Sequence, residues 1–176
     1  RILVGGRDAA RARELVAELD DAAPFVCDLA DEDAVAAACA GIGRLDVLVH
    51  SAGIGRSNDI GLASRALWRE VFETNVFAVA DLPRLLLPAL EATRGIVVAI
   101  NSGAGFFSSP GGAVYAGSKF ALRALTDALR EEMRGKVRVC SVHPGRTDTD
   151  MQRELQAAMG NEHYDGARYV APESVA

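Results

Sequence analysis

Three short apolar runs constrain the fold of this chain most strongly, and each ends at polar or glycine residues. They span residues 46–50, 95–100 and 137–142. Apolar side chains fill nearly every position instead of every second one, which is typical of parallel strands covered on both faces. Two shorter runs, at 2–4 and 24–27, predict two further strands nearer the N-terminus.

Stretches with helical spacing separate the apolar runs. Asp8 and Asp31 stand where N-caps are expected, and longer helices are expected over 64–92 and 114–134. Regular alternation of strand and helix predicts βαβ crossovers. We therefore expect an α/β fold with a doubly wound parallel sheet, a Rossmann fold in three layers, forming a single domain over residues 1–176. Ligands of such sheets bind at the carboxyl ends of the strands.

The bulk composition argues against several classes of partner. A net charge of −5 does not favour a nucleic-acid surface. Membrane partners are not expected, because no apolar run approaches the ~18 residues that span a bilayer. Cys27, Cys39 and Cys140 show neither metal-ligand nor disulfide spacing. We expect no metal site, and free thiols in a reducing cytoplasm.

Tyr115 and Lys119 form the main chemical motif. They lie four residues apart on an expected helix and so share one face. A free tyrosine has a pKa near 10, and a nearby ammonium would lower that pKa toward neutrality. Such a tyrosine can exchange a proton with an alcohol or carbonyl. Ser102, thirteen residues earlier at a strand end, can hold the same substrate oxygen. Hydride transfer would need a cofactor, because no side chain carries a hydride.

A series of motifs around this pair resembles the short-chain dehydrogenase/reductase family over nearly the whole chain. Residues 115–122, YAGSKFAL, are similar to the family's active-site helix, and Ser102 lies at the usual distance before it. Residues 50–53, HSAG, resemble the family's Asn-Ala-Gly turn, with Ser51 in place of the asparagine. That replacement removes an amide from the turn.

Further matches extend the resemblance toward both ends of the chain. Thr74-Asn75-Val76 resembles the segment with the family's fourth catalytic residue. Residues 143–145, followed by Thr149, resemble the Pro-Gly turn and its nicotinamide-contacting threonine. Asp28 matches the acid that usually contacts the adenine ring.

The resemblance implies hydride transfer between a nicotinamide cofactor and a small carbonyl or secondary alcohol substrate. Tyr115 would be the general acid/base, and Lys119 would lower its pKa and hold the nicotinamide ribose. Ser102 would position the substrate oxygen. Asn75 would anchor a water that relays protons from Lys119. The implied cofactor-binding residues are Arg7, Asp28, Leu29, Ser51, Ala52, Gly53, Tyr115, Lys119, Pro144, Gly145, Thr147 and Thr149.

The residue after the first strand bears on the choice of cofactor. An acid there would bind the ribose 2′-hydroxyl of NAD and repel a 2′-phosphate. This chain has Gly6 followed by Arg7, and a guanidinium suits a phosphate. We expect NADP, with NAD as the alternative.

The family's opening strand and glycine-rich turn have no match in the chain. Gly5-Gly6-Arg7 fails the spacing of that turn, and the following strand is placed as a second strand should be. In the strand order 3-2-1-4-5-6 the unmatched strand is central, and its loss would leave unpaired backbone groups on both neighbours. We expect the domain to be incomplete at both ends. Roughly thirty residues, one βα unit, would precede Arg1, and a last strand would follow Ala176.

Alternative functions remain open at this point. Nicotinamide-dependent epimerases and dehydratases share the Tyr/Lys pair, and a non-catalytic NADP-binding regulator would retain the fold. His50 and His143 are interpreted as ordinary polar residues near the cofactor, and Asp148 and Asp150 as caps of the next helix.

The substrate determinants are expected in two loops, 103–112 and 149–171. Candidate apolar pocket residues in or beside them are Phe106, Phe107, Met151 and Met159. Trp68, Phe72 and Phe77 are interpreted as core or subunit contacts. The resemblance implies a homodimer or homotetramer joined through the helix around residues 68–90 and the Tyr115 helix.

Overall fold

Strands and helices alternate through the computed structural model, which describes residues 1–158, 160–161 and 163–175. In chain order the elements are β1 (Ile2–Gly6), α1 (Ala9–Ala17), β2 (Ala22–Val26), α2 (Glu32–Cys39), β3 (Val47–His50), α3 (Arg65–Phe72), α4 (Ala78–Glu91), β4 (Ile96–Ile100), α5 (Ala113–Glu132), β5 (Arg138–Val142) and α6 (Asp150–Ala158). Asp8 and Asp31 cap α1 and α2 as expected, since their carboxylates accept backbone N–H groups of the first turn. The helices therefore begin where the sequence predicts.

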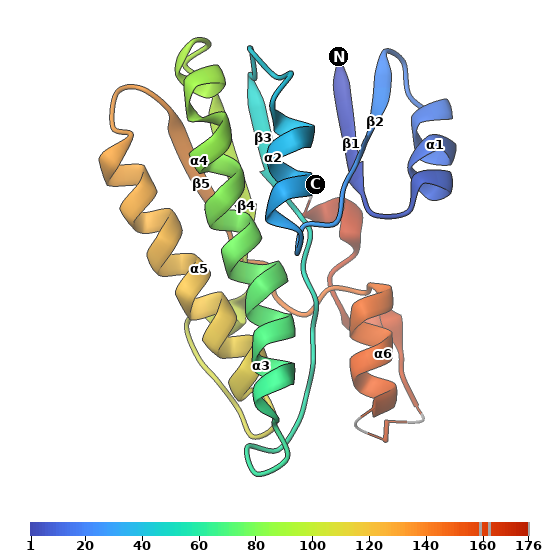
Figure 1. The fold of residues 1–176 in the computed structure, drawn as a ribbon. Coiled ribbons are helices and arrows are strands. Elements are labelled where there is room, and N and C mark those ends of the chain that lie inside the picture. Colours follow the sequence, from blue (N-terminus) through green and yellow to red (C-terminus); the bar gives the residue numbers. More distant parts are fainter. Residues whose placement is uncertain (159, 162, 176) are drawn as a thin grey trace.

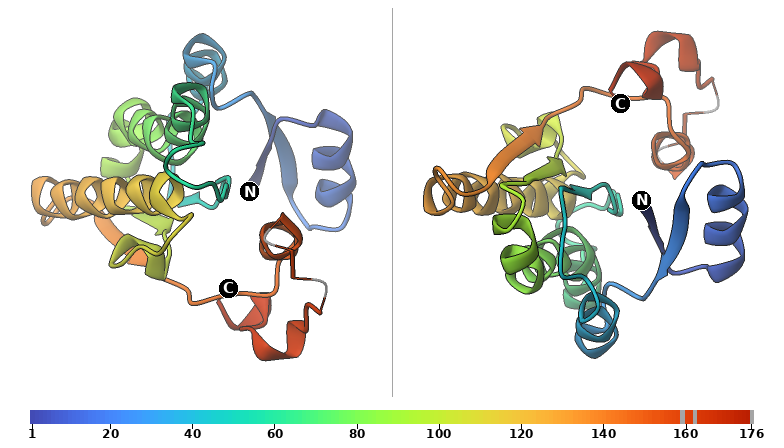
Figure 2. Two further views of the ribbon diagram at one scale, coloured as in Figure 1. Left: turned by 90° about the horizontal axis from the view of Figure 1, so that it is seen from below. Right: turned by 90° about the horizontal axis from the view of Figure 1, so that it is seen from above.

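The strands are all parallel and form two groups. β1 pairs with β2, and β3, β4 and β5 form a second sheet in that order. Viewed along the strands, α4 and α5 lie on one side and α1 on the other (Figure 2). The doubly wound, three-layer α/β class is thereby confirmed. β2 begins two residues earlier than expected and contains Pro24, which an edge strand tolerates because it need not donate on its outer side.

The core lies between the β3–β4–β5 sheet and three helices, α2, α4 and α5 (Figure 1). Leu90, Val97 and Leu122 are almost completely buried there. Removal of such side chains from water stabilises the fold by roughly 1.5–3 kcal/mol each. This packing fixes α5, which carries Tyr115, against β4, which Ser102 follows.

β3 departs from the sequence prediction. Its apolar run indicated a strand covered on both faces, and Val97 and Val139 on β4 and β5 are indeed buried. Val47 and Val49, however, are 51% and 54% exposed. The reason is that β3 is an edge strand within the described residues, with β4 on one side only. A further strand between β1 and β3 remains a prediction.

The long helical region 64–92 forms as expected but is interrupted by a wider turn. Glu73–Phe77 is π-helical and joins α3 to α4. π-turns often occur at functional sites, because the extra residue re-aims a side chain. Here the turn contains Asn75, which is 1% exposed. Phe77 in the same turn is exposed, whereas Trp68 packs over Gly117 of α5.

Candidate active site

Ser102 and Tyr115 come together where β4 ends and α5 begins. Ser102 follows β4, and its hydroxyl accepts a hydrogen bond from the Ala104 N–H at 3.1 Å, which shapes the short 3₁₀ turn Gly103–Gly105. Tyr115 lies in the first turn of α5 and is half-buried. Burial raises the pKa of its phenol, and hydrogen bonding to the Ser102 side chain acts in the opposite direction. The two side chains expected to share a substrate oxygen are therefore neighbours.

Lys119 lies one turn after Tyr115 and is 5% exposed. Its amine donates a hydrogen bond to the Ile100 carbonyl at 3.0 Å and stands 5.8 Å from the Tyr115 ring centroid. Burial lowers the pKa of this amine to about 8. The amine binds a carbonyl and burial dominates the environment of the phenol, so the role of Lys119 in lowering the tyrosine pKa stays a prediction.

Asn75 anchors the loop that follows β3. Its Oδ1 accepts from the Ile54 N–H at 2.8 Å, and its Nδ2 donates to the Ile54 carbonyl at 2.9 Å. Nδ2 also donates to the Ser118 hydroxyl at 3.0 Å, which in turn donates to the Tyr115 carbonyl at 2.7 Å. Asn75 therefore links the loop after β3 to the Tyr115 helix.

Gly53 lies where this loop approaches Lys119. A Cβ at residue 53 would come within 3.4 Å of Asn75 Oδ1 and 3.9 Å of Lys119 Nζ. Glycine keeps that space open beside the amine. Ser51 and Ala52, the other expected contacts of this turn, are exposed at the end of β3.

The Pro-Gly turn after β5 is tied to the loop that carries Ser102. The Gly103 N–H donates to the Pro144 carbonyl at 3.0 Å, and Gly145 is exposed beyond it. Thr147 follows, with its hydroxyl donating to the Gly145 carbonyl at 3.2 Å. Pro144, Gly145 and Thr147 thus lie along the chain that leaves the Ser102 loop.

Thr149, rather than Asp148 or Asp150, caps α6. Its hydroxyl accepts from the Gln152 N–H at 3.3 Å. Asp148 is engaged elsewhere, accepting from the Tyr164 hydroxyl at 2.8 Å and from Arg153. The expectation that these two acids cap the helix was therefore wrong, because Tyr164 and Arg153 compete for Asp148 and Asp150 already lies inside the first turn.

Helix α6 covers the loop after β3. The Met151 sulfur and a Leu155 methyl carbon lie 3.1 Å from the position of a Cβ at Gly55, which is buried. Met151 therefore packs over the loop that Asn75 anchors. Met159 lies outside the described residues.

A small cavity of about 100 Å³ adjoins Tyr115. Its lining consists of Ala104, Phe107, Ser108, Ser109, Gly112, Tyr115 and Ala116. Phe107 was an expected pocket residue. Phe106 is not part of this lining and packs instead on His143, with ring centroids 4.5 Å apart.

Three expected cofactor residues lie on the β1–β2 unit, which is hydrogen-bonded separately from the sheet that carries Ser102. Arg7 is exposed in the turn between β1 and α1. The Asp28 carboxylate accepts from the Ala30 N–H at 3.0 Å, and Leu29 packs against the core. These residues stand at the carboxyl ends of β1 and β2, and nothing in the described contacts joins them to Tyr115.

Two structural features near the candidate site were not predicted from the sequence. Ser118 links Asn75 to the backbone of Tyr115, and the four-residue spacing of Tyr115 and Lys119 does not indicate this role. Asn101 is 4% exposed, and both polar atoms of its amide lack partners among the described residues. No spacing rule points to either residue, because the contacts of Ser118 and the burial of Asn101 both depend on tertiary packing.

Comparisons with known proteins agree with this fold and arrangement. A sequence model described as short chain dehydrogenase matches residues 1–160. Serine 3-dehydrogenase of Agrobacterium fabrum is 33% identical over 189 residues, covering 100% of this chain and 75% of that protein. Dehydrogenase/reductase SDR family member 7B of Mus musculus is 35% identical, covering 97% of this chain and 55% of that protein.

A solved structure shows the same fold. Gluconate 5-dehydrogenase of Burkholderia cenocepacia, in complex with NADP and tartrate, superposes with a TM-score of 0.79 at 25% identity, covering 91% of this chain and 67% of that one. The chain belongs to the short-chain dehydrogenase/reductase family, whose members are NAD(P)-dependent oxidoreductases.

Proposed function

We propose that the protein transfers a hydride between NADP(H) and a small carbonyl or secondary alcohol, with Tyr115 as general acid/base. The observation that carries the proposal is the convergence of Ser102, Tyr115 and Lys119 where β4 ends and α5 begins. When bound, the nicotinamide supplies or accepts the hydride. Side chains of the protein move the proton and position the substrate and the cofactor.

Tyr115 moves the proton of the substrate oxygen. Burial raises the pKa of the phenol, so it is protonated at neutral pH and suited to donate to a carbonyl oxygen. Ser102 holds the same oxygen by a hydrogen bond. The Lys119 ammonium uses one of its three protons on the Ile100 carbonyl, which leaves two for ribose hydroxyls. Asn75 keeps the loop after β3 in place and anchors a water for proton relay.

Two observations support a nicotinamide dinucleotide as the cofactor. Gly53 leaves space beside the Lys119 amine that a side chain would fill. At the adenine end, Asp8 follows Arg7 in the sequence, and its carboxylate accepts hydrogen bonds from the N–H groups of Ala10 and Arg11. Arg7 is therefore the group offered to a ribose substituent, which supports NADP over NAD. Asp28, Leu29, Ser51, Ala52, Pro144, Gly145, Thr147 and Thr149 complete the proposed cofactor site.

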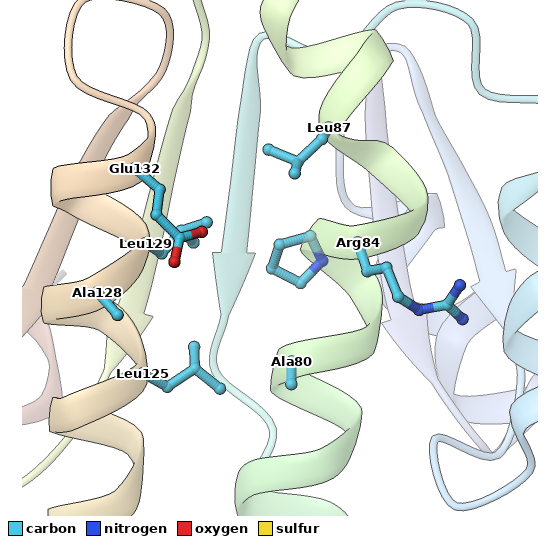
Figure 3. Close-up of a pocket in the computed structure, with 8 residues that line it drawn as sticks. Ala80, Arg84, Leu87, Leu125, Ala128, Leu129 and Glu132 are labelled. Atoms are coloured by element: carbon cyan, nitrogen blue, oxygen red, sulfur yellow. The ribbon is translucent and has the colours of Figure 1, made fainter.

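A groove between α4 and α5 supports assembly into a homodimer or homotetramer. It has a volume of about 370 Å³ and lies away from Tyr115. In Figure 3, Leu87 and Leu125 point into it from facing helices, Glu132 reaches toward its edge, and the Arg84 side chain extends away from α5. Its apolar lining with charged edges is typical of protein interfaces. We also propose a single domain and a cytoplasmic location, because the chain belongs to the short-chain dehydrogenase/reductase family.

No helix in the described residues is long and apolar enough to cross a bilayer.

Nicotinamide absorbance at 340 nm tests the proposed activity in the intact protein. NADPH and NADH are each offered with a panel of ketones and aldehydes, and NADP⁺ and NAD⁺ with secondary alcohols. L-Serine is included because a relative is named serine 3-dehydrogenase. Turnover with NADPH that disappears in Tyr115→Phe supports the proposal. Binding of cofactor without any turnover across the panel favours the regulator, and product formation without net cofactor oxidation favours an epimerase or dehydratase.

A further inference from the structure

His143 contacts the backbone of Ser102. It follows β5 directly, and its Nδ1 lies 3.1 Å from the Ser102 carbonyl oxygen. Its Nε2 lies 3.0 Å from the Ser141 hydroxyl. A carbonyl oxygen can only accept, so Nδ1 carries the proton. In the neutral imidazole Nε2 then holds a lone pair, and the Ser141 hydroxyl donates to it.

The same carbonyl accepts a second hydrogen bond. The Gly105 N–H donates to the Ser102 oxygen at 3.0 Å, so both lone pairs of this oxygen are used. One bond comes from the turn that follows Ser102, and the other comes from the residue after β5. His143 is thus one of two links between the Ser102–Gly103 peptide and the segment after β5, the other being the bond from the Gly103 N–H to the Pro144 carbonyl.

Aromatic packing fixes the plane of the imidazole. The Phe106 ring centroid lies 4.5 Å from that of His143, and the Arg123 guanidinium lies 4.7 Å from the Phe106 centroid. Arg123 belongs to α5, two turns after Tyr115. The stack therefore connects the imidazole to the helix that carries the proposed acid.

We propose that His143 is a positioning residue that holds the Ser102 hydroxyl in line with the Tyr115 phenol. It acts through the Ser102 backbone, and Ser141 sets the required imidazole tautomer. Without the Nδ1–H bond, the peptide between Ser102 and Gly103 keeps only the bond from the Gly103 N–H to the Pro144 carbonyl as its tie to the segment after β5, and it can tilt about that bond, which carries the hydroxyl away from Tyr115. Small displacements of a positioned group reduce catalysis strongly. The inference rests on the proposed function of Ser102 and Tyr115.

The acidity of residue 115 gives a readout that needs no substrate. A hydrogen bond from Ser102 stabilises the phenolate, so its loss raises the phenol pKa by about 0.5–1 unit. In the intact protein, 3-fluorotyrosine is placed at position 115, and its phenol is titrated by ¹⁹F NMR. Ser102→Ala sets the scale of the shift. His143→Leu removes the donor, and His143→Asn retains an N–H donor near the position of Nδ1. His163→Leu, at an exposed histidine, is the control.

The inference predicts a rise in the pKa of residue 115 for Ser102→Ala and His143→Leu, and a value near that of the parent protein for His143→Asn and His163→Leu. Ser141→Ala, a milder change that keeps the imidazole, should shift the pKa in the same direction as His143→Leu. Ser141→Ala replaces His143→Leu as the test if His143→Leu does not fold. A shift in Ser102→Ala without one in His143→Leu or Ser141→Ala overturns the inference and leaves the proposed function standing. No shift in Ser102→Ala overturns both the inference and the proposed role of Ser102.

Discussion

The side-chain amide of Asn75 donates a hydrogen bond to the Ser118 hydroxyl at 3.0 Å and joins the π-turn between α3 and α4 to the second turn of the Tyr115 helix. Ser118 is completely buried. The same amide makes two hydrogen bonds to the backbone of Ile54. One side chain therefore fixes the relative positions of three segments that border the candidate site.

Asn75→Ala should lower the free energy of unfolding by about 2–3 kcal/mol. The change leaves a partly buried N–H and carbonyl of Ile54 without partners, and loss of the partner of such a group costs about 1–3 kcal/mol. Urea unfolding followed by circular dichroism measures the difference. Asn161→Ala, at an exposed asparagine, is the control and should change stability by less than ~0.5 kcal/mol. Equal stabilities of the two variants would contradict the linking role of Asn75.

Lys119→Met should stabilise the fold while impairing function. The pKa of Lys119 in the fold, about 8, lies below that of a free lysine, so the folded state binds this proton less tightly. Burial of Lys119 therefore lowers the free energy of unfolding by its full amount below pH 8. This penalty shrinks as the pH rises from 8 to 10.5. Removal of the charge should raise the free energy of unfolding at pH 7 by about 1 kcal/mol or more, and the gain should vanish above pH 10.5.

The same variant should bind NADPH more weakly and turn over more slowly, because the ammonium is proposed to hold the ribose. Fluorescence titration of NADPH measures binding. Lys136→Met provides the matched control, since Lys136 is exposed and pairs with Glu91 at 3.5 Å. Unchanged NADPH affinity in Lys119→Met would remove Lys119 from the cofactor site.

His50 should make the protein sensitive to mild acid. Its side chain is 5% exposed, and burial lowers its pKa from 6.5 to about 4. The unfolded chain binds a proton below pH 6.5 and the folded chain does not, so stability falls as the pH drops from 6.5 toward 4. At pH 5 the loss from His50 alone is about 2 kcal/mol.

Chemical unfolding at pH 7.5 and pH 5 checks this expectation. His50→Leu should remove most of the difference, whereas His163→Leu should retain it. Asp8 and Asp148, whose pKa values are lowered from 3.8, lose their contributions only at more acidic pH. A pH dependence identical in His50→Leu and in the parent protein would assign the effect to other groups.

Arg7→Asp should weaken NADPH binding more than NADH binding. The guanidinium is proposed to pair with the 2′-phosphate, and a carboxylate would repel that phosphate while accepting from a free 2′-hydroxyl. Dissociation constants for both cofactors provide the comparison, with Arg44→Asp, at another exposed arginine, as the control. An equal loss for NADPH and NADH would refute the assignment of Arg7.

Local patterns predicted most of the fold. Asp8 and Asp31 mark helix starts by their capping chemistry, and the runs at Val97 and Val139 mark buried strands. Exposure of Val47 and Val49 was not predictable, because burial depends on which strands pair. The π-turn at Asn75 was also missed, since the turn keeps the same residue types as an α-helix.

The candidate site was predicted as a set of residues but not as a set of contacts. Four-residue spacing places Tyr115 and Lys119 on one face, yet it does not show that the Lys119 amine bonds to the Ile100 carbonyl. The link from His143 to Ser102 joins residues 41 positions apart in sequence. Such contacts follow from the packing of β4, β5 and α5, which short-range spacing does not encode.

Turnover by Tyr115→Phe, measured beside NADPH affinity, tests the central claim most directly. Loss of the phenol hydroxyl should reduce turnover by ~10²-fold or more, the usual scale of general acid–base catalysis, while NADPH binding stays within about twofold of the parent protein. Near-normal turnover in this variant would contradict the assignment of Tyr115 as the acid/base.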